Sequence, residues 1–381
     1  RGNLKKQVLG GLRSYIGLCN GMYRHIPAEF LGAKVLKNLK EKYKIEDKDI
    51  DYIIAGNGVG AGGNITRLMT LEAGIDENVP AFTVDMQCCS GLESIAVAYA
   101  KIASGQADMI IAGGFESSST QPIRGYNKNH PDYTENSFYT VAKFIPNNHR
   151  ETIMLEGAEY TAIKENITKE ELDLWALKSH ERAVRARQEH LLDDIVVSIN
   201  DSDKDEGIRA KMSERLLKRM PKLLLNGEVT TAGNSCLIND GAAFVIVCSE
   251  EYLKKIGQKA QARILDYCAC GVNPMLSPMG SIKAIKKLLM QKNLDIKNID
   301  CFEVNEAFAV IDVLFERNFP EVIDRYNIFG GALAYGHPYG VSGAMILLHL
   351  IKSLEYRKGK LGCCSIAGAG GLGSAMTIEY L

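Results

Sequence analysis

Residues 84–106 read VDMQCCSGLESIAVAYAKIASGQ and place two adjacent cysteines, Cys88 and Cys89, directly before a Ser-Gly pair. The small and apolar residues that follow recur at the spacing of an α-helix, and Gly105 stands where a C-terminal cap is expected. A helix with so few polar residues is expected in a central layer of the fold. Its N-terminus, and with it the two cysteines, therefore points at the interior. The apolar positions of this predicted helix are Leu92, Ile95, Ala96, Tyr99 and Ile102.

The two ends of the chain repeat one pattern. KDIDYIIAGN, around residue 50, and KNIDCFEVNE, around residue 298, each place a charged turn before an apolar strand. Further along each half, a Ser-Gly pair opens a helix, at Ser90 in the first half and Ser342 in the second. A short apolar strand that ends in glycines follows each helix. Three matched features in the same order predict a duplicated α/β unit.

Residues 118–227 interrupt this pattern with charged sequence that shows little strand character. Within them, Thr168 and Glu171 form a capping-box pattern before a predicted amphipathic helix, LDLWALKSHERAVRARQE. The chain is therefore divided into four parts. These are an N-terminal half at 1–117, an excursion that covers the site at 118–227, a return strand of the first half at 228–250 and a C-terminal half at 251–381.

The composition indicates a globular protein whose surface favours neither nucleic acid nor a membrane. The 381 residues carry a formal net charge of −1, with basic and acidic residues interspersed. No apolar run approaches the roughly 20 residues that span a bilayer, and no signal-peptide pattern opens the sequence. We therefore expect the cytoplasm as the compartment. The sequence begins with Arg1 rather than a methionine, and we expect a first strand to be missing before it.

The ten cysteines lie mostly in apolar segments, and none forms a CxxC pair. Reduced, buried thiols are expected, without a metal centre. Cys88 and Cys89 allow two interpretations. At a helix N-terminus, the dipole and the unpaired N–H groups stabilise a thiolate and can hold an oxyanion. The alternative is that both cysteines are small residues of the core.

The second half supplies a histidine at the matching place. In GGALAYGHPYGVSG, residues 330–343, His337 lies in a glycine-rich loop just before the second helix. Because the halves are duplicates, we expect the two helix N-termini to face each other, which predicts a Cys/His pair. Asn305, in VNEAF, follows the first strand of the second half. The carboxyl end of such a strand is where open α/β sheets bind ligands, although a buried asparagine can also be purely structural.

These motifs together resemble those of thiolases, which are CoA-dependent acyltransferases that make or break carbon–carbon bonds. CCSGL is similar to the family's Cys-x-Ser-Gly-Leu nucleophile motif, and TTAGNSCLINDGAA, at 230–243, to its Asn-x-Ser-Gly-Ile-Asn-Asp-Gly-Ala segment. NEAF and GGALAYGHPYGVSGA resemble its Asn-Glu-Ala-Phe and Gly-His-Pro blocks. The resemblance covers essentially the whole chain. It implies an α/β fold of five layers, α-β-α-β-α, built from two duplicated halves with a loop domain over the active site.

The resemblance also implies roles for individual residues. Cys88 would be the nucleophile, and His337 would take its proton and help to hold the thioester oxygen with a water fixed by Asn305. Backbone N–H groups of Cys88 and of the loop at Gly370 and Gly371 would form a second oxyanion hole. The residues implied to line the substrate are Ser235, Cys236 and Met154, with Cys236 in the place of a serine in the family.

Acyl-CoA and CoA are the implied partners, with CoA a substrate and no cofactor bound permanently. A homodimer or a homotetramer is the implied assembly. The acyl chain length, the direction of the reaction in the cell and the choice between dimer and tetramer stay open.

One position departs from the family pattern. Thiolases usually carry a second cysteine, in a C-terminal Cys-x-Gly-Gly-Gly block, that moves a proton to and from the α-carbon. Here the block reads SIAGAGGLGSA and places Ala367 where that cysteine belongs. Alanine cannot transfer a proton. A bulge in the preceding strand could instead bring Cys364 or Cys363 into place.

Two functions therefore compete. The first is an acetyl-CoA acetyltransferase or 3-ketoacyl-CoA thiolase that works through an acyl-cysteine. The second keeps the acyl-cysteine without the usual carbon–carbon step, as an acyltransferase, a thioesterase or a decarboxylating condensing enzyme. A third class, a non-catalytic acyl-CoA-binding protein, requires an unreactive Cys88.

Overall fold

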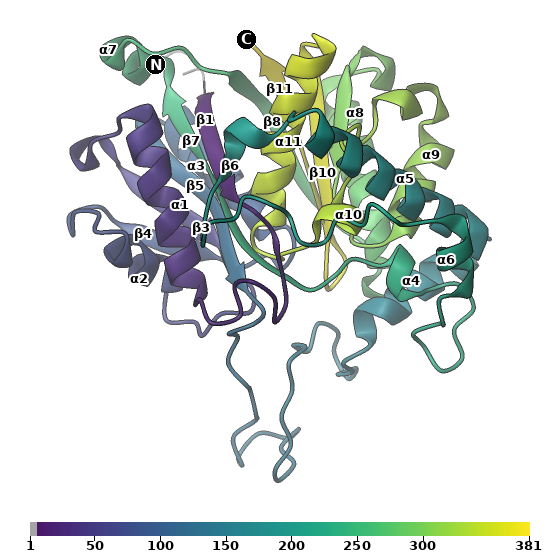
Figure 1. Ribbon diagram of the computed structural model, residues 1–381. Helices are drawn as coiled ribbons and strands as arrows, with labels where there is room; N and C mark the ends of the chain where they lie inside the picture. The colour runs from purple at the N-terminus through teal and green to yellow at the C-terminus, as the bar shows by residue number, and fades with distance from the viewer. Residues whose placement is uncertain (1–5) are drawn as a thin grey trace.

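The strands of residues 6–381, which the structure describes, join into one eleven-stranded sheet (Figure 1). In this computed structural model the strand order is β4-β3-β5-β7-β1-β8-β11-β10-β9, and the short strands β2 and β6 pair with β7 and β1. The strands are β1 (Lys6–Ser14), β2 (Gly17–Leu18), β3 (Tyr52–Gly56), β4 (Ala81–Val84), β5 (Met109–Ser117), β6 (Val196–Val197), β7 (Asn239–Ser249), β8 (Ala262–Gly271), β9 (Cys301–Val304), β10 (Leu361–Gly368) and β11 (Leu372–Tyr380).

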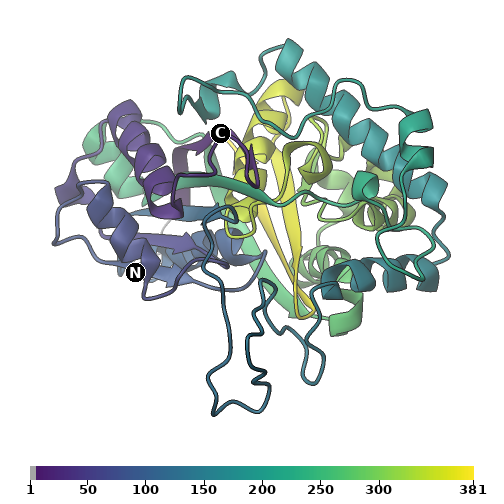
Figure 2. The same ribbon diagram turned by 60° about the horizontal axis from the view of Figure 1, so that its bottom comes forward.

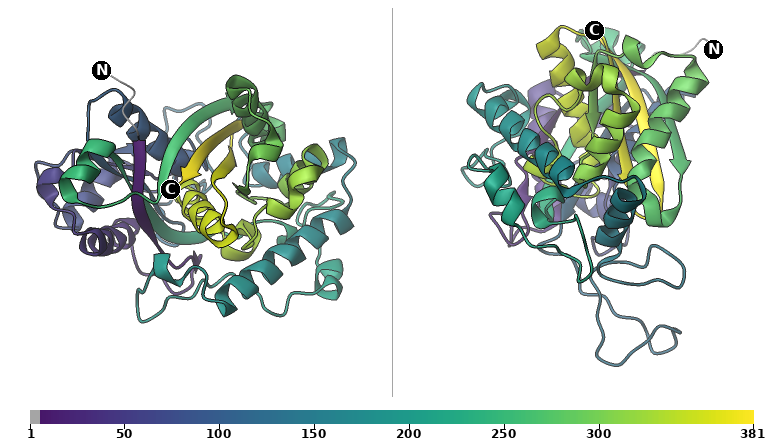
Figure 3. Two further views of the ribbon diagram at one scale, coloured as in Figure 1. Left: turned by 90° about the horizontal axis from the view of Figure 1, so that it is seen from above. Right: turned by 90° about the vertical axis from the view of Figure 1, so that its right-hand side faces the viewer.

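Two helices lie between the two halves of this sheet (Figures 1 and 3). α3 (Ser90–Ala103) contacts β3 and β5 on one side and β11 on the other, while α11 (Ser342–Arg357) contacts β9 and β10 as well as β5 and β7. α1 (Ala28–Tyr43) and α2 (Ile65–Glu72) cover one outer face, and α8 (Gly280–Lys292) with α9 (Ala309–Asn318) covers the other. The predicted five-layer order is confirmed.

Within residues 6–381 the half-sheets are paired at two positions, where β1 meets β8, and the interior helices supply further contacts between the halves. α7 (Glu250–Ile256) connects β7 to β8. None of the helices in residues 6–381 combines the length and the hydrophobicity needed to cross a membrane.

The duplication extends to single hydrogen bonds. β3 runs parallel to β5 in the first half, as β9 does to β10 in the second. The carboxylate of Asp51 accepts backbone N–H bonds from residues 108–109 at 2.7 and 3.0 Å, where β5 begins. The carboxylate of Asp300 accepts them from residues 360–361 at 2.7 and 2.9 Å, where β10 begins. The repeated aspartate thus fastens each first strand to its parallel neighbour.

The two interior helices begin in backbone-to-backbone contact. A Cβ atom placed on Gly343 would lie 2.1 Å from the backbone nitrogen of Leu92, and one on Gly91 would lie 2.8 Å from the carbonyl oxygen of Gly340. No side chain fits between the helices at this point. The prediction that the two helix N-termini face each other is therefore confirmed.

The excursion between β5 and β7 lies against the second half of the molecule. After an extended segment that projects from the body (Figure 2) come α4 (Ile153–Lys164), α5 (Lys169–Gln188) and α6 (Glu214–Arg219). The predicted capping box is present, because Thr168 and Glu171 bond each other's backbone N–H groups. α5 contacts α9 and the short helix α10 (Ala332–Tyr335), which ends two residues before His337.

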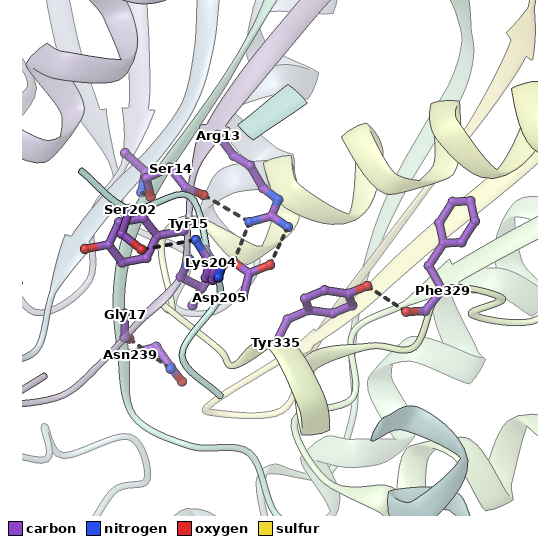
Figure 4. Close-up of polar contacts among 12 residues, drawn as sticks. Arg13, Ser14, Tyr15, Gly17, Ser202, Lys204, Asp205, Asn239, Phe329 and Tyr335 are labelled. Atoms are coloured by element: carbon purple, nitrogen blue, oxygen red, sulfur yellow. Dashed lines mark hydrogen bonds and ion pairs between the residues drawn. The ribbon is translucent and has the colours of Figure 1, made fainter. Parts of the chain in front are cut away.

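A buried ion pair fastens the loop of the excursion between α5 and α6 to β1 (Figure 4). Arg13, which is fully buried, donates from Nη1 and Nη2 to the carboxylate of Asp205 at 2.8 and 2.9 Å. The same carboxylate accepts the backbone N–H of Ile16 at 2.7 Å. The guanidinium also lies over the ring of Tyr335, 5.7 Å from its centroid. This pair, called the Arg13–Asp205 clamp below, connects β1, the excursion and the loop of His337.

Replacing Gly343 with alanine tests the helix contact. We expect Gly343→Ala to lower the free energy of unfolding by about 2 to 3 kcal/mol, because the methyl group has no space beside Leu92. The matched control is Gly157→Ala, in the interior of α4, where a Cβ would meet its nearest neighbour at an ordinary 3.5 Å. That variant should gain up to about 1 kcal/mol from helix propensity. Urea denaturation followed by circular dichroism measures both, and equal midpoints for the two variants would contradict the contact.

Candidate active site

A tight turn between β4 and α3 presents the two cysteines. Gln87 has φ 53°, an unusual left-handed conformation for a residue with a side chain. The hydroxyl of Ser90 stabilises the turn, since it accepts the N–H of Met86 at 2.7 Å and donates to the carbonyl of Gln87 at 2.6 Å. The two residues of the predicted Ser-Gly pair therefore have different functions. Ser90 closes the turn, and Gly91 allows the backbone at the start of α11 to approach closely.

The two thiols point to different places. Sγ of Cys88 lies at the backbone N–H groups of Ala369 and of Cys88 itself, which face it from the β10–β11 hairpin and from the start of α3. Sγ of Cys89 is fully buried and donates to the carbonyl oxygen of Ile366, 3.5 Å away. Only Cys88 thus has the two N–H groups that an acyl oxygen needs.

The loop that faces Cys88 is held by glycines. Gly370 and Gly371 have φ 80° and 81°, and a Cβ on Gly371 would lie 2.3 Å from the carbonyl oxygen of Val272. Side chains are excluded there. The N–H that reaches the thiol belongs to Ala369, one residue before the glycines expected from the sequence. The glycines shape the hairpin, and the alanine supplies the donor.

Burial keeps the thiol of Cys88 protonated. It raises the pKa of Cys88 to about 12, and the N–H groups of Ala369 and Cys88 only partly oppose this rise. The acidic side chains of Glu116 and Asp85 raise the pKa further. The helix N-terminus was expected to favour the thiolate, and here desolvation outweighs it. A base is therefore needed to activate this cysteine.

The loop of His337 holds both its backbone and its ring. Its backbone N–H donates to Oδ1 of Asn239 at 2.9 Å, and its Nδ1 lies 2.6 Å from the hydroxyl of Ser342. We assign the ring proton to Nδ1, which donates to Ser342, whose hydroxyl donates in turn to the carbonyl of Pro338. The oxygen and nitrogen of an amide are interchangeable in such a network, and this tautomer requires the amide of Asn305 to present its oxygen to Nδ1. Nε2 then carries a free lone pair and is buried without a partner among the described residues. Burial also lowers the pKa of His337 to about 4, so the ring is neutral.

Asn305 lies beside this histidine. Its backbone N–H donates to the carbonyl of Ser365, and its Nδ2 lies 3.3 Å from Nδ1 of His337. The neighbouring Glu306 points elsewhere and accepts a hydrogen bond from Ser179 of α5 at 2.7 Å. Within the NEAF motif, the asparagine therefore belongs to the site and the glutamate fastens the excursion.

The segment before β7 forms another wall of the site. Cys236 donates its backbone N–H to the carbonyl of Ala307 at 2.8 Å, and Ile238 pairs with His337 in an isolated parallel bridge. Burial and the neighbouring Cys88 thiol raise the pKa of Cys236 to about 12. Ser235 is buried, and its hydroxyl has no partner among the described residues. Met154 of α4 is half-buried against the same apolar cluster as Cys236, so the three predicted lining residues lie on neighbouring elements.

Two residues at the site were not identified from the sequence. The buried carboxylate of Glu116 accepts three backbone N–H bonds, from Gly58 at 2.8 Å, Val59 at 3.0 Å and Gly340 at 2.9 Å. Burial raises the pKa of this carboxyl to about 7. Tyr339 packs edge-on against the ring of His337, with centroids 5.2 Å apart. A single carboxylate in the strand IIAGGFES was the available signal for the first, and none marked the second.

The structure does not support Cys364 as a substitute for Ala367. β10 pairs with β9 and β11 in unbroken register from Leu361 to Gly368, so this strand lacks the bulge that the substitution requires. The side chain of Cys364 packs in the interior cluster around α11, on the face opposite to Ala367. Cys363 shares the face of Ala367 but lies four residues away, roughly 13 Å along a strand. The expectation that either cysteine reaches the site is corrected.

Comparison with known proteins agrees with this geometry. The family described as "Thiolase, N-terminal domain" matches residues 7–251, and "Thiolase, C-terminal domain" matches residues 258–380. A putative acetyl-CoA C-acetyltransferase of Bacillus subtilis (strain 168) is 34% identical and covers 98% of this chain and 99% of its own. A probable acetyl-CoA acyltransferase of Staphylococcus aureus (strain COL) is 32% identical, with 97% of each chain covered.

Solved structures agree as well. The Bacillus anthracis acetyl-CoA acetyltransferase superimposes with a TM-score of 0.93 at 29% identity, covering 100% of both chains. Human mitochondrial 3-ketoacyl-CoA thiolase in complex with CoA gives 0.91 at 29% identity, with 99% of this chain and 98% of that one covered. These relatives favour thiolase chemistry over the thioesterase and decarboxylase alternatives. The chain belongs to the thiolase family of acyltransferases.

Proposed function

We propose that this thiolase cleaves and forms 3-ketoacyl-CoA through an acyl group carried on Cys88. In cleavage, Sγ of Cys88 attacks the 3-keto carbon while its proton passes to Nε2 of His337. The bond between C2 and C3 then breaks, acetyl-CoA leaves, and CoA removes the acyl group from Cys88. The reverse sequence condenses two acyl-CoA molecules, and with two acetyl-CoA molecules it gives acetoacetyl-CoA.

The observation that carries this proposal is that the thiol of Cys88 and the imidazole of His337 are both buried and uncharged. With a pKa of about 12, the thiolate fraction of Cys88 at pH 7 is on the order of 10⁻⁵. Such a thiol is inert until a base takes its proton. His337 is neutral and has a free Nε2 lone pair, and its ring packs on Tyr339, a residue close enough to Cys88 to feel its charge. Proton transfer within the pair turns an inert thiol into a nucleophile only when the site is occupied.

Two groups of donors suit the two oxygens of the reaction. The N–H groups of Cys88 and Ala369 support a role in holding the oxygen of the acyl group on Cys88, with Gly370 and Gly371 shaping their loop. His337 and a water held by Asn305 are proposed to hold the thioester oxygen of acetyl-CoA. The 3.3 Å contact between the two side chains supports this second role.

Coenzyme A is the proposed substrate, and its pantetheine arm is proposed to lie between the excursion and residues 230–240. Ser235, Cys236 and Met154 are the proposed lining residues, and their burial on neighbouring elements supports this. The solved structure of the human thiolase in complex with CoA supports CoA as the substrate here. The names of the bacterial relatives support acetyl-CoA as the acyl donor.

We further propose a cytoplasmic homodimer or homotetramer that serves lipid metabolism. The side chains of the edge strand β4 are all half-buried, and Ile123 and Phe138 on the projecting segment are 75% and 69% exposed. Partially covered edges and apolar side chains of this kind favour self-association. Sedimentation equilibrium at micromolar concentration should give at least a dimer, and a monomer would contradict the assembly. Fractionation of native cells should recover the activity in the soluble cytoplasm rather than in a membrane or an organelle.

The proposed reaction is tested by mixing the protein with acetoacetyl-CoA and CoA. Loss of absorbance reports cleavage, and intact-mass analysis of the same sample should find one acetyl group on Cys88. Cys88→Ala should remove the adduct and the cleavage, while Cys89→Ala should keep the adduct because Sγ of Cys89 points at Ile366. An acetyl group on Cys89 of the native chain would overturn the assignment.

The pH dependence of alkylation tests the buried thiol. Because burial raises the pKa of Cys88 to about 12, the fraction of reactive thiolate keeps increasing with pH at every pH below that value. The rate of carboxamidomethylation by iodoacetamide should therefore rise about tenfold per pH unit from pH 6 to 9 without levelling off. Peptide mass spectrometry at Cys88 measures this rate, with Cys88→Ala as the blank. A plateau below pH 8 would mean a stabilised thiolate and would rule out the neutral pair.

A further inference from the structure

Thiolysis of a 3-ketoacyl-CoA requires an acid that Cys88, His337 and Asn305 do not supply. When the bond between C2 and C3 breaks, acetyl-CoA leaves as a carbanion, and its α-carbon must receive a proton. His337 already holds the proton of Cys88 at that moment, and Ala367 has none to give. This inference rests on the proposed function, and it asks which side chain supplies the second proton.

Most acidic groups near the site are unavailable. The carboxyl of Glu116 is occupied by three backbone N–H groups. Sγ of Cys89 is turned to the carbonyl of Ile366, away from the hairpin N–H that marks the acyl position. Cys364 lies on the wrong face of β10. Burial raises the pKa of the Tyr339 phenol further than that of the Cys236 thiol, so Cys236 is the stronger acid of the two.

Cys236 lies on a segment that contacts the loops of both Asn305 and His337. Its own backbone N–H is bonded to Ala307, two residues after Asn305. Two residues further along its segment, Ile238 pairs with His337. Its half-buried side chain packs against the cluster that contains Ala367 and Ala307, and its thiol is close enough to that of Cys88 for each to disfavour the other's charge.

Two buried polar atoms beside it lack partners among the described residues. These are Nε2 of His337, whose side chain is 1% exposed, and the hydroxyl of Ser235, which is 4% exposed. Buried polar atoms of this kind are normally satisfied, so each of them points to a polar ligand. Ser235 directly precedes Cys236, and His337 pairs with Ile238 of the same segment.

We propose that Cys236 donates and recovers the proton of the carbon–carbon step, in place of a thiol at position 367. In cleavage, Cys88 gives its proton to His337 and bonds to the 3-keto carbon. The C2–C3 electron pair then takes the proton of Cys236, which gives acetyl-CoA and leaves a thiolate on Cys236. CoA next gives its thiol proton to Cys236 and attacks the acyl group, and Cys88 departs and recovers its proton from His337. Each group ends as it began.

The acidity of Cys236 suits both halves of this cycle. Burial raises its pKa to about 12, so the resting side chain is a protonated thiol and ready to donate. Once the imidazolium of His337 has formed, the opposite charge favours a transient thiolate on Cys236. In the condensation direction, that thiolate is basic enough to remove a proton next to a thioester.

The test separates acylation from carbon–carbon chemistry. Acetylation of Cys88 by acetyl-CoA is measured by intact mass, and exchange of the acetyl-CoA methyl protons in D₂O is measured by NMR. Cys236→Ser should acetylate Cys88 within about threefold of the native rate and lose methyl exchange and thiolysis by at least 100-fold, the lower range for general acid–base catalysis. Cys270→Ser, a half-buried thiol packed on the same cluster, is the matched control and should change neither.

A second variant places a thiol at position 367. Adding Ala367→Cys to Cys236→Ser should recover methyl exchange, which a purely structural role for Cys236 does not predict. Native-like exchange in Cys236→Ser, or an equal loss of exchange and acetylation, would overturn the inference. If the native protein itself acetylates Cys88 but exchanges no methyl protons, the proposed carbon–carbon reaction fails, and the inference fails with it.

Discussion

The close contact of two helix N-termini at Gly91 and Gly343 is the constraint from which the site follows. Each helix is followed and preceded by strands of its own half, so their contact fixes the distance between the halves. It also brings the turn of Cys88 and the loop of His337 to one point, because both lie within a few residues of the contact. Helix N-termini supply unpaired N–H groups, and two of them facing each other make an interior that accepts negative oxygen atoms.

Burial sets the chemistry at that point. Excluding water strengthens the hydrogen bonds to a developing oxyanion, but it also disfavours every isolated charge. The site therefore rests with a neutral thiol and a neutral imidazole, and charge appears only as a separated pair during the reaction. The same argument explains the carboxylate of Glu116, which is tolerated because three backbone N–H groups surround it. Its ligands come from both halves, so it also holds the loop of Gly340 in place.

The sequence alone predicted the strands and helices that occur in both halves, but it did not identify site residues that occur only once. The duplicated blocks predicted the paired strands and helices, and the capping box at Thr168 marked the start of α5 within one residue. The matching hydrogen bonds of Asp51 and Asp300 were found only in the structure. Glu116 and Tyr339 left no pattern, because their partners are backbone groups and rings brought together from distant segments. The place of Cys364 depended on a bulge that the sequence could neither predict nor exclude, because a run such as CCSIAG fits a regular or a bulged strand until its pairing is known.

The Arg13–Asp205 clamp has a consequence for how this chain can change over generations. Removing either partner leaves a buried charge without compensation, at a cost of about 3 to 5 kcal/mol, which is a large part of the 5 to 15 kcal/mol that stabilises a typical domain. A substitution at one of the two positions is therefore tolerated only together with a compensating substitution at the other. In the described residues, the projecting segment between β5 and α4 has no comparable bond to β1, so changes of its length cost less stability than changes at Asp205. Variation in chain length is therefore expected in the outer part of the excursion, while the loop of Asp205 stays anchored.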